Sequence, residues 1–335
     1  MNIRSLHLAA SALHWPARVV TAAELDARFG LPAGWTEERT GVVRRRFVEP
    51  GRDTNASMGA AAVRRVLDAA GLGFAEVDLL VNASGSIQQP IPCTAALIQR
   101  ELGEAAAASG VPCLDLNATC LSFLFALEFA GSWLAARGAG HVLIVSSEIA
   151  SQGVDWSDPH SACLFGDGAA ACLLEHAPGA GSGLLASRFE TFSEGSEHCE
   201  VRGGAQAHPP WTYAPERHQD FVFRMDGPAV HRLAAKRLPG LVERVLADAG
   251  LRMDELAAVV PHQAGITPMR LVERRLGLAP GQMVFTLAEH GNLIAASIPT
   301  ALHLARESGR VRAGDRVLLL GTAAGYAQGA VVWQL

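Results

Sequence analysis

An internal repeat is the feature that most constrains how this 335-residue chain can fold. The stretch VRRVLDAAGLGFAEVDLLV (63–81) aligns without a gap with VERVLADAGLRMDELAAVV (242–260), and about half of the positions are identical. Two further pairs follow in the same order along the chain: LIQRELG (97–103) with LVERRLG (271–277), and HVLIVSSE (141–148) with RVLLLGTA (316–323). One helical match could arise by chance, but three in one order indicate two copies of a single structural unit.

Each copy alternates strands with helices. In each copy an amphipathic helix ends at a glycine, Gly71 or Gly250, as a helix C-terminus commonly does. The predicted strands are short and apolar, which is typical of strands covered on both faces: VDLLVNAS, HVLIVSSE, AVVPHQAG and RVLLLGTA. This alternation predicts an α/β fold with parallel sheets.

A break in the pattern divides the chain into two halves. A strand gives way to Pro and Gly in AAACLLEHAPG, so we place the boundary near residue 176, with one half at 1–176 and the other at 177–335. The second half carries a polar segment at about 189–223, rich in His, Glu and Pro, that has no counterpart in the first. We expect a long loop or cap insertion there, and such loops often carry function.

Charge and hydropathy exclude several classes of partner. The net charge is −5 and the pI is near 6.2, and the one block of like charges is Arg44–Arg46, so no nucleic-acid surface is expected. No segment has the roughly 18 unbroken apolar residues of a membrane span. The opening MNIRSLHLAASALHWPARVV is interrupted by His7 and His14, which suits a first strand better than a secretory signal. We therefore expect a soluble cytoplasmic protein.

Six cysteines, at positions 93, 113, 120, 163, 172 and 199, are spread over the chain without a CxxC pair. A disulfide framework is not expected in a chain of this size and type. A zinc site needs clustered ligands, which the adjacent His198 and Cys199 alone do not supply, so no metal site is predicted. Cys113, Cys163 and Cys172 lie in apolar runs, where cysteine usually packs as a small hydrophobe.

Cys120 stands apart because of its place in the repeat. In LDLNATCLSFLFALEF a strand-like run ends and a very apolar helix begins at this cysteine. In the second half LAEHGNLIAASIPTALHLA places Asn292 at the equivalent junction, and His262 in VVPHQAG stands where a second-half strand ends. Helices related by duplication should be related by a pseudo-two-fold axis, so their N-termini can face one site. We therefore expect Cys120, His262 and Asn292 to converge.

Such a convergence would make the cysteine a nucleophile. A thiolate at a helix N-terminus is favoured by the helix dipole and by unpaired N–H groups, and an adjacent imidazole favours it further. Taken singly, each residue has an ordinary structural interpretation: a cysteine packed in the core, a satisfied buried histidine, and a turn or N-cap asparagine. The combination at matched loops is what favours catalysis.

Several motifs together resemble the ketoacyl-ACP synthase III branch of the thiolase superfamily. They are NATCLSF, VPHQAG, EHGNLIAASIP, FGDGAAACLLE (165–175), GTAAGYAQGAVVWQL (321–335), ERTGVVRRRF (38–47) and FRMDGPAVHRLA (223–234), and the resemblance runs nearly end to end. It implies a thiolase-like five-layered α-β-α-β-α fold built from two duplicated halves. It also implies that no cofactor is needed, that the substrates are thioesters of CoA or of acyl carrier protein, and that the protein is a homodimer.

The resemblance further implies a two-step reaction. Cys120 would take an acyl group from an acyl-CoA or acyl-ACP, with the backbone N–H groups of Cys120 and Ala324 as the oxyanion hole. His262 and Asn292 would then bind the thioester carbonyl of a malonyl unit while CO2 departs. The enolate would attack the acyl-cysteine in a decarboxylative Claisen condensation and give a β-ketoacyl thioester. Two neutral donors suit an oxygen that develops negative charge.

Five further positions concern substrate binding. Trp35 and Arg39 match one side of the family's adenine pocket, and Ile91 falls near its acyl pocket. Gly265 and Thr267 stand where the housekeeping enzyme of fatty acid initiation has Asn and Arg, which contact pantetheine and the carrier protein. These departures leave the acyl donor and carrier open, and they predict a specialised homologue that makes or transfers acyl groups in a secondary pathway.

Related branches can be weighed from the same residues. A degradative thiolase would carry a second cysteine in the terminal loop, and GTAAGYAQG has none. Hydroxymethylglutaryl-CoA synthases and olefin-forming condensing enzymes would carry a glutamate near Ile91. Two alternatives stay open: an acyltransferase that passes the Cys120-bound acyl group to an alcohol or amine, and a non-catalytic partner in a heterodimeric condensing enzyme. The intact Cys, His and Asn weigh against the last.

Overall fold

Two five-stranded sheets form the framework of the molecule in the computed structural model, which describes residues 4–335. The first sheet has the order β2 (His7–His14), β8 (Asp167–Glu175), β7 (His141–Ile149), β5 (Leu79–Asn82) and β6 (Cys113–Asp115). The second has the order β1 (Arg4–Ser5), β9 (Gly183–Thr191), β14 (Ala327–Gln334), β13 (Arg316–Ala323) and β12 (Ala258–Pro261). The four strands predicted from the repeat are β5, β7, β12 and β13.

The two sheets repeat one topology. β5 and β7 pair in parallel, with Leu79 opposite Val142, and β12 pairs in the same way with β13. In both sheets the next strand, β8 or β14, runs antiparallel, and β2 or β9 pairs with it in turn. The place of β6 is taken in the second sheet by a single bridge between Val259 and Met283. The structure therefore shows the same duplication as the sequence.

The sheets are mixed, whereas the sequence pattern predicted parallel sheets. β8 follows β7 through residues 150–166, where the helical element is the short α7 (Pro159–Ala162). A parallel neighbour needs a crossover of a dozen or more residues, usually a helix, whereas a chain that turns straight back runs antiparallel. β14 follows β13 through a still shorter turn, so both sheets have the same antiparallel side.

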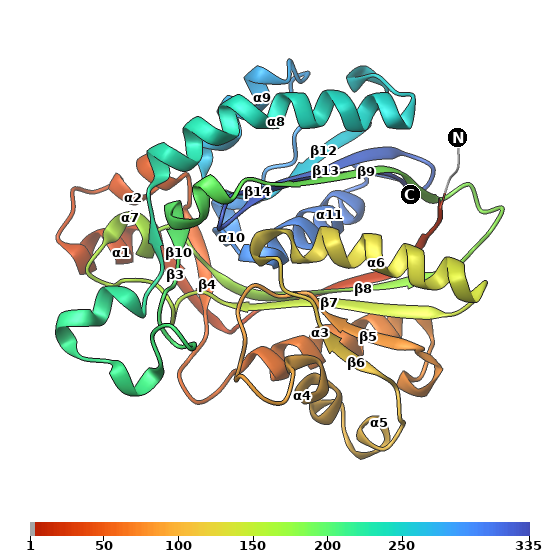
Figure 1. The fold of residues 1–335 in the computed structure, drawn as a ribbon, viewed down its shortest axis with the longest axis horizontal. Helices are drawn as coiled ribbons and strands as arrows, with labels where there is room; N and C mark the ends of the chain where they lie inside the picture. Colours follow the sequence, from red (N-terminus) through yellow and green to blue (C-terminus); the bar gives the residue numbers. More distant parts are fainter. Residues whose placement is uncertain (1–3) are drawn as a thin grey trace.

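Helices cover both faces of each sheet and give five layers, α-β-α-β-α (Figure 1). α3 (Asn55–Ala70) packs on the outer face of the first sheet, beside α4 (Thr94–Glu101) and α5 (Glu104–Ala107). α8 (Gly227–Ala249) covers the outer face of the second sheet, with α9 (Ile266–Arg275) beside it. The middle layer holds α6 (Ser122–Arg137) and α11 (Ser297–Glu307). The predicted five-layered thiolase-like fold is confirmed.

The repeated outer helices begin and end at residues that favour those positions. A capping box in which Thr54 and Ser57 bond each other's backbone N–H starts α3, and the side chain of Asp226 caps α8. Gly71 ends α3 with a φ of 67°, and Gly250 ends α8 with a φ of 65°. Glycine occupies this left-handed conformation without a steric penalty, so the two glycines end both helices as predicted.

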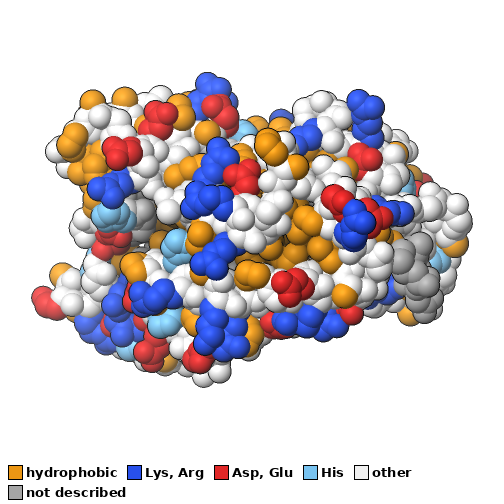
Figure 2. All heavy atoms as spheres, turned by 90° about the horizontal axis from the view of Figure 1, so that it is seen from above, with side chains coloured by type: hydrophobic (Ala, Val, Ile, Leu, Met, Phe, Trp, Pro, Cys, Tyr) orange, Lys and Arg blue, Asp and Glu red, His pale blue; other side chains and the backbone are white. Residues whose placement is uncertain are grey.

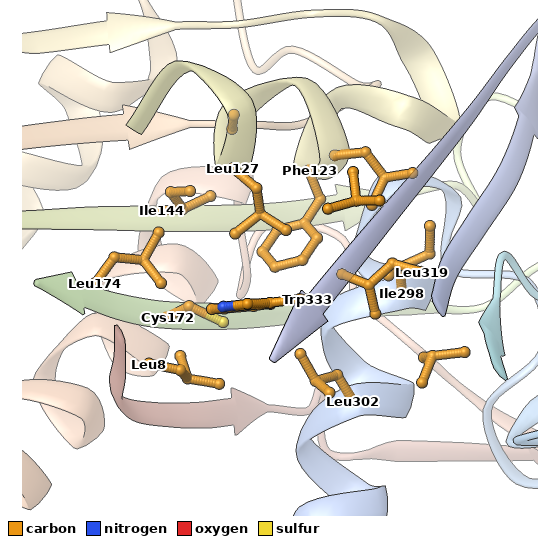
Figure 3. Packing of buried hydrophobic residues seen from close by; sticks show 14 of the residues in the cluster. Leu8, Phe123, Leu127, Ile144, Cys172, Leu174, Ile298, Leu302, Leu319 and Trp333 are labelled. Atoms are coloured by element: carbon orange, nitrogen blue, oxygen red, sulfur yellow. The ribbon is translucent and has the colours of Figure 1, made fainter. Parts of the chain in front are cut away.

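The middle layer contains a core shared by both sheets. Trp333 of β14 is fully buried, and its Nε1 donates to the Leu6 carbonyl at 3.0 Å. In Figure 3 the indole lies between Phe123 and Leu127 of α6 on one side and Leu302 of α11 on the other. Both sheets thus bury their inner faces against the same two helices, which fixes how the halves sit on each other.

The first of these helices is unusually apolar. The stretch Thr119–Arg137 is long and apolar enough to cross a membrane by length and composition, with a mean hydropathy of 1.5, whereas no such stretch was predicted from the sequence. Half of it is buried, and it lies between the two sheets in the middle layer. Its place in the core accounts for its composition, because a helix covered on several sides is apolar all round.

The predicted boundary near residue 176 falls in the loop that joins β8 to β9, but two details differ from the predicted halves. β1 pairs with β9, so the first described residues belong to the second sheet. The polar segment predicted at 189–223 begins as the end of β9. The irregular part spans 192–226, with a two-stranded sheet of β10 (Cys199–Glu200) and β11 (Arg224–Met225).

A corner beside the sheets completes the fold. It contains a second two-stranded sheet and two short helices: β3 (Arg18–Thr21), β4 (Arg44–Phe47), α1 (Ala22–Phe29) and α2 (Trp35–Thr40). The short α10 (Leu287–His290) contacts β4. On the face seen in Figure 2, acidic and basic side chains are interspersed. Arg188 and Asp248, both partly exposed, form one of the ion pairs of the described chain.

Replacing the central indole tests the role of the middle layer. The substitution Trp333→Ala should lower the free energy of unfolding by about 3–5 kcal/mol, because it removes a large buried side chain and leaves a cavity. Urea denaturation followed by circular dichroism measures the change. The control Trp211→Ala alters an indole that is 84% exposed and should change stability by less than about 0.5 kcal/mol. A loss below about 1 kcal/mol for Trp333→Ala would contradict this role.

Candidate active site

The three residues expected to converge line one cavity. Cys120, His262 and Asn292 border a pocket of about 510 Å³ with mostly apolar walls. The pocket lies where the heads of α6 and α11 meet. The short 3-10 turns that precede these helices, η2 (Thr119–Leu121) and η7 (Ile294–Ala296), contact each other. The structure therefore brings together a thiol and an asparagine from the two halves, with a histidine beside them.

Cys120 lies in a strained turn. The preceding Thr119 has a φ of 50°, a left-handed conformation that is rare for a β-branched residue. Two side chains hold this turn: Asn117 Oδ1 accepts from Thr119 N at 2.8 Å, and Ser122 Oγ accepts from Ala118 N at 2.9 Å. Strain of this kind persists only where the surroundings over-determine the backbone, and it is concentrated at functional sites.

The second half builds the same turn at the head of α11. Ile294 has a φ of 49°, and Asn292 Oδ1 accepts from its N–H at 2.9 Å. Ser297 Oγ accepts from Leu293 N at 3.0 Å, as its counterpart does in the first half. These matched hydrogen bonds pair the sequence NATCLS (117–122) with NLIAAS (292–297).

This pairing corrects the register predicted from the sequence. Asn292 corresponds to Asn117 rather than to Cys120, and the counterpart of Cys120 is Ala295. The junction itself is equivalent in the two halves, as predicted, but the two candidate side chains occupy different positions of one shared turn. The hydrogen bonds of the turn, which the sequence does not display, decide the register.

Asn292 is held in place through its backbone and its side-chain oxygen. The residue is buried, its N–H donates to the Leu164 carbonyl at 3.0 Å, and its own carbonyl accepts from Gly166 N at 3.0 Å. Because Asn292 Oδ1 accepts a hydrogen bond from Ile294 N, the side-chain Nδ2 remains to donate a hydrogen bond into the cavity. The asparagine is thereby oriented as a hydrogen-bond donor.

His262 follows β12 and is buried. Its N–H donates to the Leu320 carbonyl at 2.7 Å, and among the described residues Nδ1 has no hydrogen-bond partner. Burial lowers the pKa of His262 to about 4, and a hydrogen bond to the backbone of Ile294 offsets this only in part. The imidazole is therefore neutral near pH 7. Its counterpart in the first half is Ala83, whose N–H makes the same bond to β7.

Burial also dominates the electrostatics of Cys120. It raises the pKa of the thiol, and the neighbouring Cys199 and Glu148 raise it further. The backbone N–H groups of Ala324 and of Cys120 itself face the sulfur and act in the opposite direction. Because the burial effect is the largest, the thiol is mostly protonated near neutral pH. The thiolate expected from the helix N-terminus is thus outweighed by desolvation.

Glu148 of β7 was not predicted from the sequence as part of this region. It is fully buried, and its Oε1 accepts from Gly85 N at 2.5 Å and Ala295 N at 3.3 Å. Its Oε2 accepts from Ser86 N at 2.9 Å and Ser86 Oγ at 2.6 Å. Burial raises the pKa of Glu148 to about 7, although these hydrogen bonds act to lower it. One feature of the sequence could have indicated Glu148: it is a charged residue at the end of the apolar run HVLIVSSE, and the second copy of this run ends in Ala323.

A second cavity of about 780 Å³ adjoins the first, and it contains three of the residues predicted to bind substrate. Arg39, Gly265 and Thr267 line it. The two cavities share five wall residues, Leu164, Met225, Val230, Ala264 and Thr322. The two cavities therefore lie side by side, with these residues between them.

The other two predicted substrate-binding residues lie outside both cavities of the described chain. Trp35 begins α2 and contacts the His160 ring edge-on, with 5.1 Å between the ring centroids, and His160 lines the second cavity. Ile91 is 84% exposed in the segment between β5 and α4. No metal-binding cluster of three or more His, Cys, Asp or Glu side chains occurs within residues 4–335.

Comparisons with known proteins agree on one family. A family model described as 3-oxoacyl-(acyl-carrier-protein) synthase III matches residues 114–193, and the model of its C-terminal part matches residues 246–335. The β-ketoacyl-(acyl-carrier-protein) synthase III of Rhodobacter capsulatus is 35% identical over 321 residues, 95% of this chain and 95% of that protein. The chain belongs to the 3-oxoacyl-(acyl-carrier-protein) synthase III family.

Solved structures of similar proteins cover almost the whole chain. The 3-oxoacyl-(acyl-carrier-protein) synthase III of Aquifex aeolicus VF5 has a TM-score of 0.88 and 28% identity, covering 98% of this chain and all of that one. The priming β-ketosynthase of the R1128 polyketide biosynthetic pathway has a TM-score of 0.87 and 29% identity, covering 99% and 97%. The synthase III resemblance seen in the motifs is confirmed, and the chain is an acyltransferase of the condensing type.

The raised pKa of Cys120 predicts how the thiol reacts with iodoacetamide. Only the thiolate reacts, so a thiol whose pKa lies above the pH should react about tenfold faster for each unit between pH 7 and pH 9. Peptide mass spectrometry of the Cys120 peptide gives the rate separately from the other cysteines. A rate that is already constant across this range would mean that the helix N-terminus stabilises the thiolate after all.

Proposed function

We propose that Cys120 of this synthase III family member accepts an acyl group from an acyl thioester and that a malonyl thioester then condenses with it, with loss of CO2. The observation that carries the proposal is the single cavity lined by Cys120, His262 and Asn292. Both substrates are thioesters, so the protein itself has to supply only a nucleophile, hydrogen-bond donors and a path for the substrates.

In the first step the Cys120 sulfur attacks the thioester carbonyl, and the carrier thiol leaves. The neutral imidazole of His262 takes up the thiol proton, which returns to the departing thiolate. The backbone N–H groups of Cys120 and Ala324 receive the negative charge of the tetrahedral intermediate. Support comes from the direction of these two N–H groups, which face the sulfur.

In the second step the malonyl carboxylate leaves as CO2 and its electron pair becomes the enolate. His262 and the Asn292 Nδ2 donate hydrogen bonds to the enolate oxygen. The enolate carbon attacks the acyl-cysteine carbonyl, a carbon–carbon bond forms, and the carbon–sulfur bond breaks. The released Cys120 thiolate then takes up a proton from water, which restores the thiol. The neutral state of His262 suits this role, because a neutral ring nitrogen that bears hydrogen donates to an oxyanion without adding a full charge.

The second cavity is proposed as the route of the pantetheine arm. Arg39 and Arg275 among its walls place positive charge near a phosphate that enters with CoA or with a carrier protein. Gly265 and Thr267 lie along the same path and would set which carrier is accepted. Substrates of this kind belong to the cytoplasm, where we place the enzyme.

Separate assays of the two steps test the assignment of roles. Cys120→Ala should abolish the mass increase that acyl-CoA causes in the intact protein, because it removes the nucleophile. Asn292→Ala should still acylate, and His262→Ala should still acylate to some degree, but more slowly, because it removes the group that takes up the thiol proton. In both variants condensation should fall by about 100- to 1,000-fold, since each removes one donor to the enolate. Product mass spectrometry and release of labelled CO2 from malonyl-CoA or malonyl-ACP measure the second step.

The outcomes separate the alternatives. Normal condensation by the His262 and Asn292 variants would refute their roles. Acylation without CO2 release, together with transfer to an added alcohol or amine, would favour the simple acyltransferase, a possibility to which the unusual Gly265 and Thr267 lend support. If no member of a series of acyl-CoAs acylates Cys120 of the wild-type protein, the result would favour a non-catalytic partner in a heterodimer.

We also propose a homodimer. β6 is the edge strand of the first sheet, and Ile87 and Ile91, which lie in the segment between β5 and α4, are 53% and 84% exposed. An unpaired edge with exposed apolar side chains beside it suits a two-fold interface. Sedimentation velocity should give about twice the 35.3 kDa chain mass, and Ile91→Asp should shift the mass toward the monomer. A wild-type monomer at micromolar concentration would refute the proposal.

A further inference from the structure

Glu148 is a buried carboxylate that the two proposed steps do not use. Its four hydrogen bonds come from the backbone of the segment after β5, from Ser86 Oγ, and from Ala295 N. The bond from Ala295 is the one that crosses between the halves, since Glu148 belongs to the first sheet and Ala295 to the turn that carries Asn292. The carboxylate therefore ties that turn to the opposite half.

The duplication explains why the Glu148 carboxylate can be accommodated beside the Asn292 turn. Under the pairing of the two turns, the N–H of Ala295 is the counterpart of the Cys120 N–H, which faces the cysteine sulfur. Glu148 itself pairs with Ala323, which is next to Ala324, the residue whose N–H also faces the Cys120 sulfur. Glu148 thus fills the pseudo-symmetric counterpart of the anion-binding position at Cys120. At the counterpart site Ala295 stands in place of the cysteine and Ala83 in place of the histidine, and the Glu148 carboxylate is the acceptor there.

The segment that Glu148 binds is also wedged between the two turns. A Cβ added at Gly85 would lie 2.6 Å from Ile294 Cγ2 and 3.5 Å from the carbonyl carbon of Thr119, so there is no room for a side chain at this position beside the two strained residues. Gly85 and Ser86 line the cavity with Cys120. Ser86 Oγ additionally accepts from Asn55 Nδ2 at 3.0 Å, which anchors this segment to the head of α3.

We propose that Glu148 is a positioning residue that holds the Asn292 turn in the geometry needed for condensation. Ile294 keeps an unfavourable φ of 49° only while its neighbours hold it, and the bond from Glu148 to the next residue is one of those constraints. The hydrogen bond from Ile294 N to Asn292 Oδ1 in turn orients the side-chain amide of Asn292, and therefore sets the direction of Nδ2. The Cys120 turn has its own bonds to Asn117 Oδ1 and Ser122 Oγ, and among the described residues it donates no hydrogen bond to Glu148. The proposal rests on the proposed role of Asn292.

Two substitutions of similar size separate the acceptor from the volume it occupies. Glu148→Leu removes all acceptors and should lower the condensation kcat by about 30- to 100-fold through displacement of the asparagine, with KM for the malonyl thioester changed less than about threefold. Glu148→Gln keeps one oxygen that can face Ala295 and should retain more condensation activity than Glu148→Leu. Acylation of Cys120, followed by intact mass, should stay within about threefold of wild type in both, which also reports that the variants are folded.

The half-buried carboxylate Asp115 provides a matched control. It accepts from Thr94 N and Ala95 N at 2.8 Å each, at the start of α4 and away from the cavity. Asp115→Asn should lower thermal stability and leave the ratio of condensation to acylation unchanged. If the Glu148 variants lose both steps in equal proportion, or if Glu148→Leu condenses normally, the positioning role is refuted. If Asn292→Ala itself condenses normally, the assignment of Asn292 fails instead, and the two failures are distinguishable.

Discussion

The contact between η2 and η7 is the interaction on which the rest of the site depends. Both sheets bury their inner faces on α6 and α11, so these two helices must share one layer, and their first turns meet. η2 packs against β13 of the opposite half and η7 packs against β7, which repeats the same crossing under the pseudo-two-fold axis. The thiol of Cys120 and the amide of Asn292, which come from remote parts of the chain, are thereby held together by the core of the protein.

Symmetry at this contact is present in the backbone and absent in the side chains. Each turn has a left-handed β-branched residue, an asparagine that accepts its neighbour's N–H, and a serine that caps the turn. Only one turn carries a thiol, and only one half carries a histidine after its central strand. The asymmetry allows a single cavity to be reactive, while the equivalent position is occupied by the Glu148 carboxylate.

The fold, and the meeting of Cys120, His262 and Asn292 at one cavity, could be predicted because the sequence patterns behind them are local or repeated. Gly71 and Gly250 end their helices as single residues, and the apolar strands are short runs that can be compared directly. The antiparallel direction of β8 could not be predicted, since it depends on a connection with no strong pattern of its own. The register of the turns and the environment of Glu148 are set by hydrogen bonds between residues far apart in the chain.

The same burial that assembles the site sets its proton chemistry. Desolvation raises the pKa of the Cys120 thiol and lowers that of His262, so the pair is stable as neutral thiol and neutral imidazole. A thiolate–imidazolium pair would be favoured in an exposed site. In this buried site separating the two charges is costly until a substrate carbonyl oxygen can take the negative charge. In the proposed reaction the thiolate is therefore formed as the thioester is attacked, and the N–H groups that face the sulfur would stabilise the charge when it moves to the carbonyl oxygen. The neutral histidine is also in the state that the proposed donation to an enolate requires, so one buried environment suits both of the proposed steps.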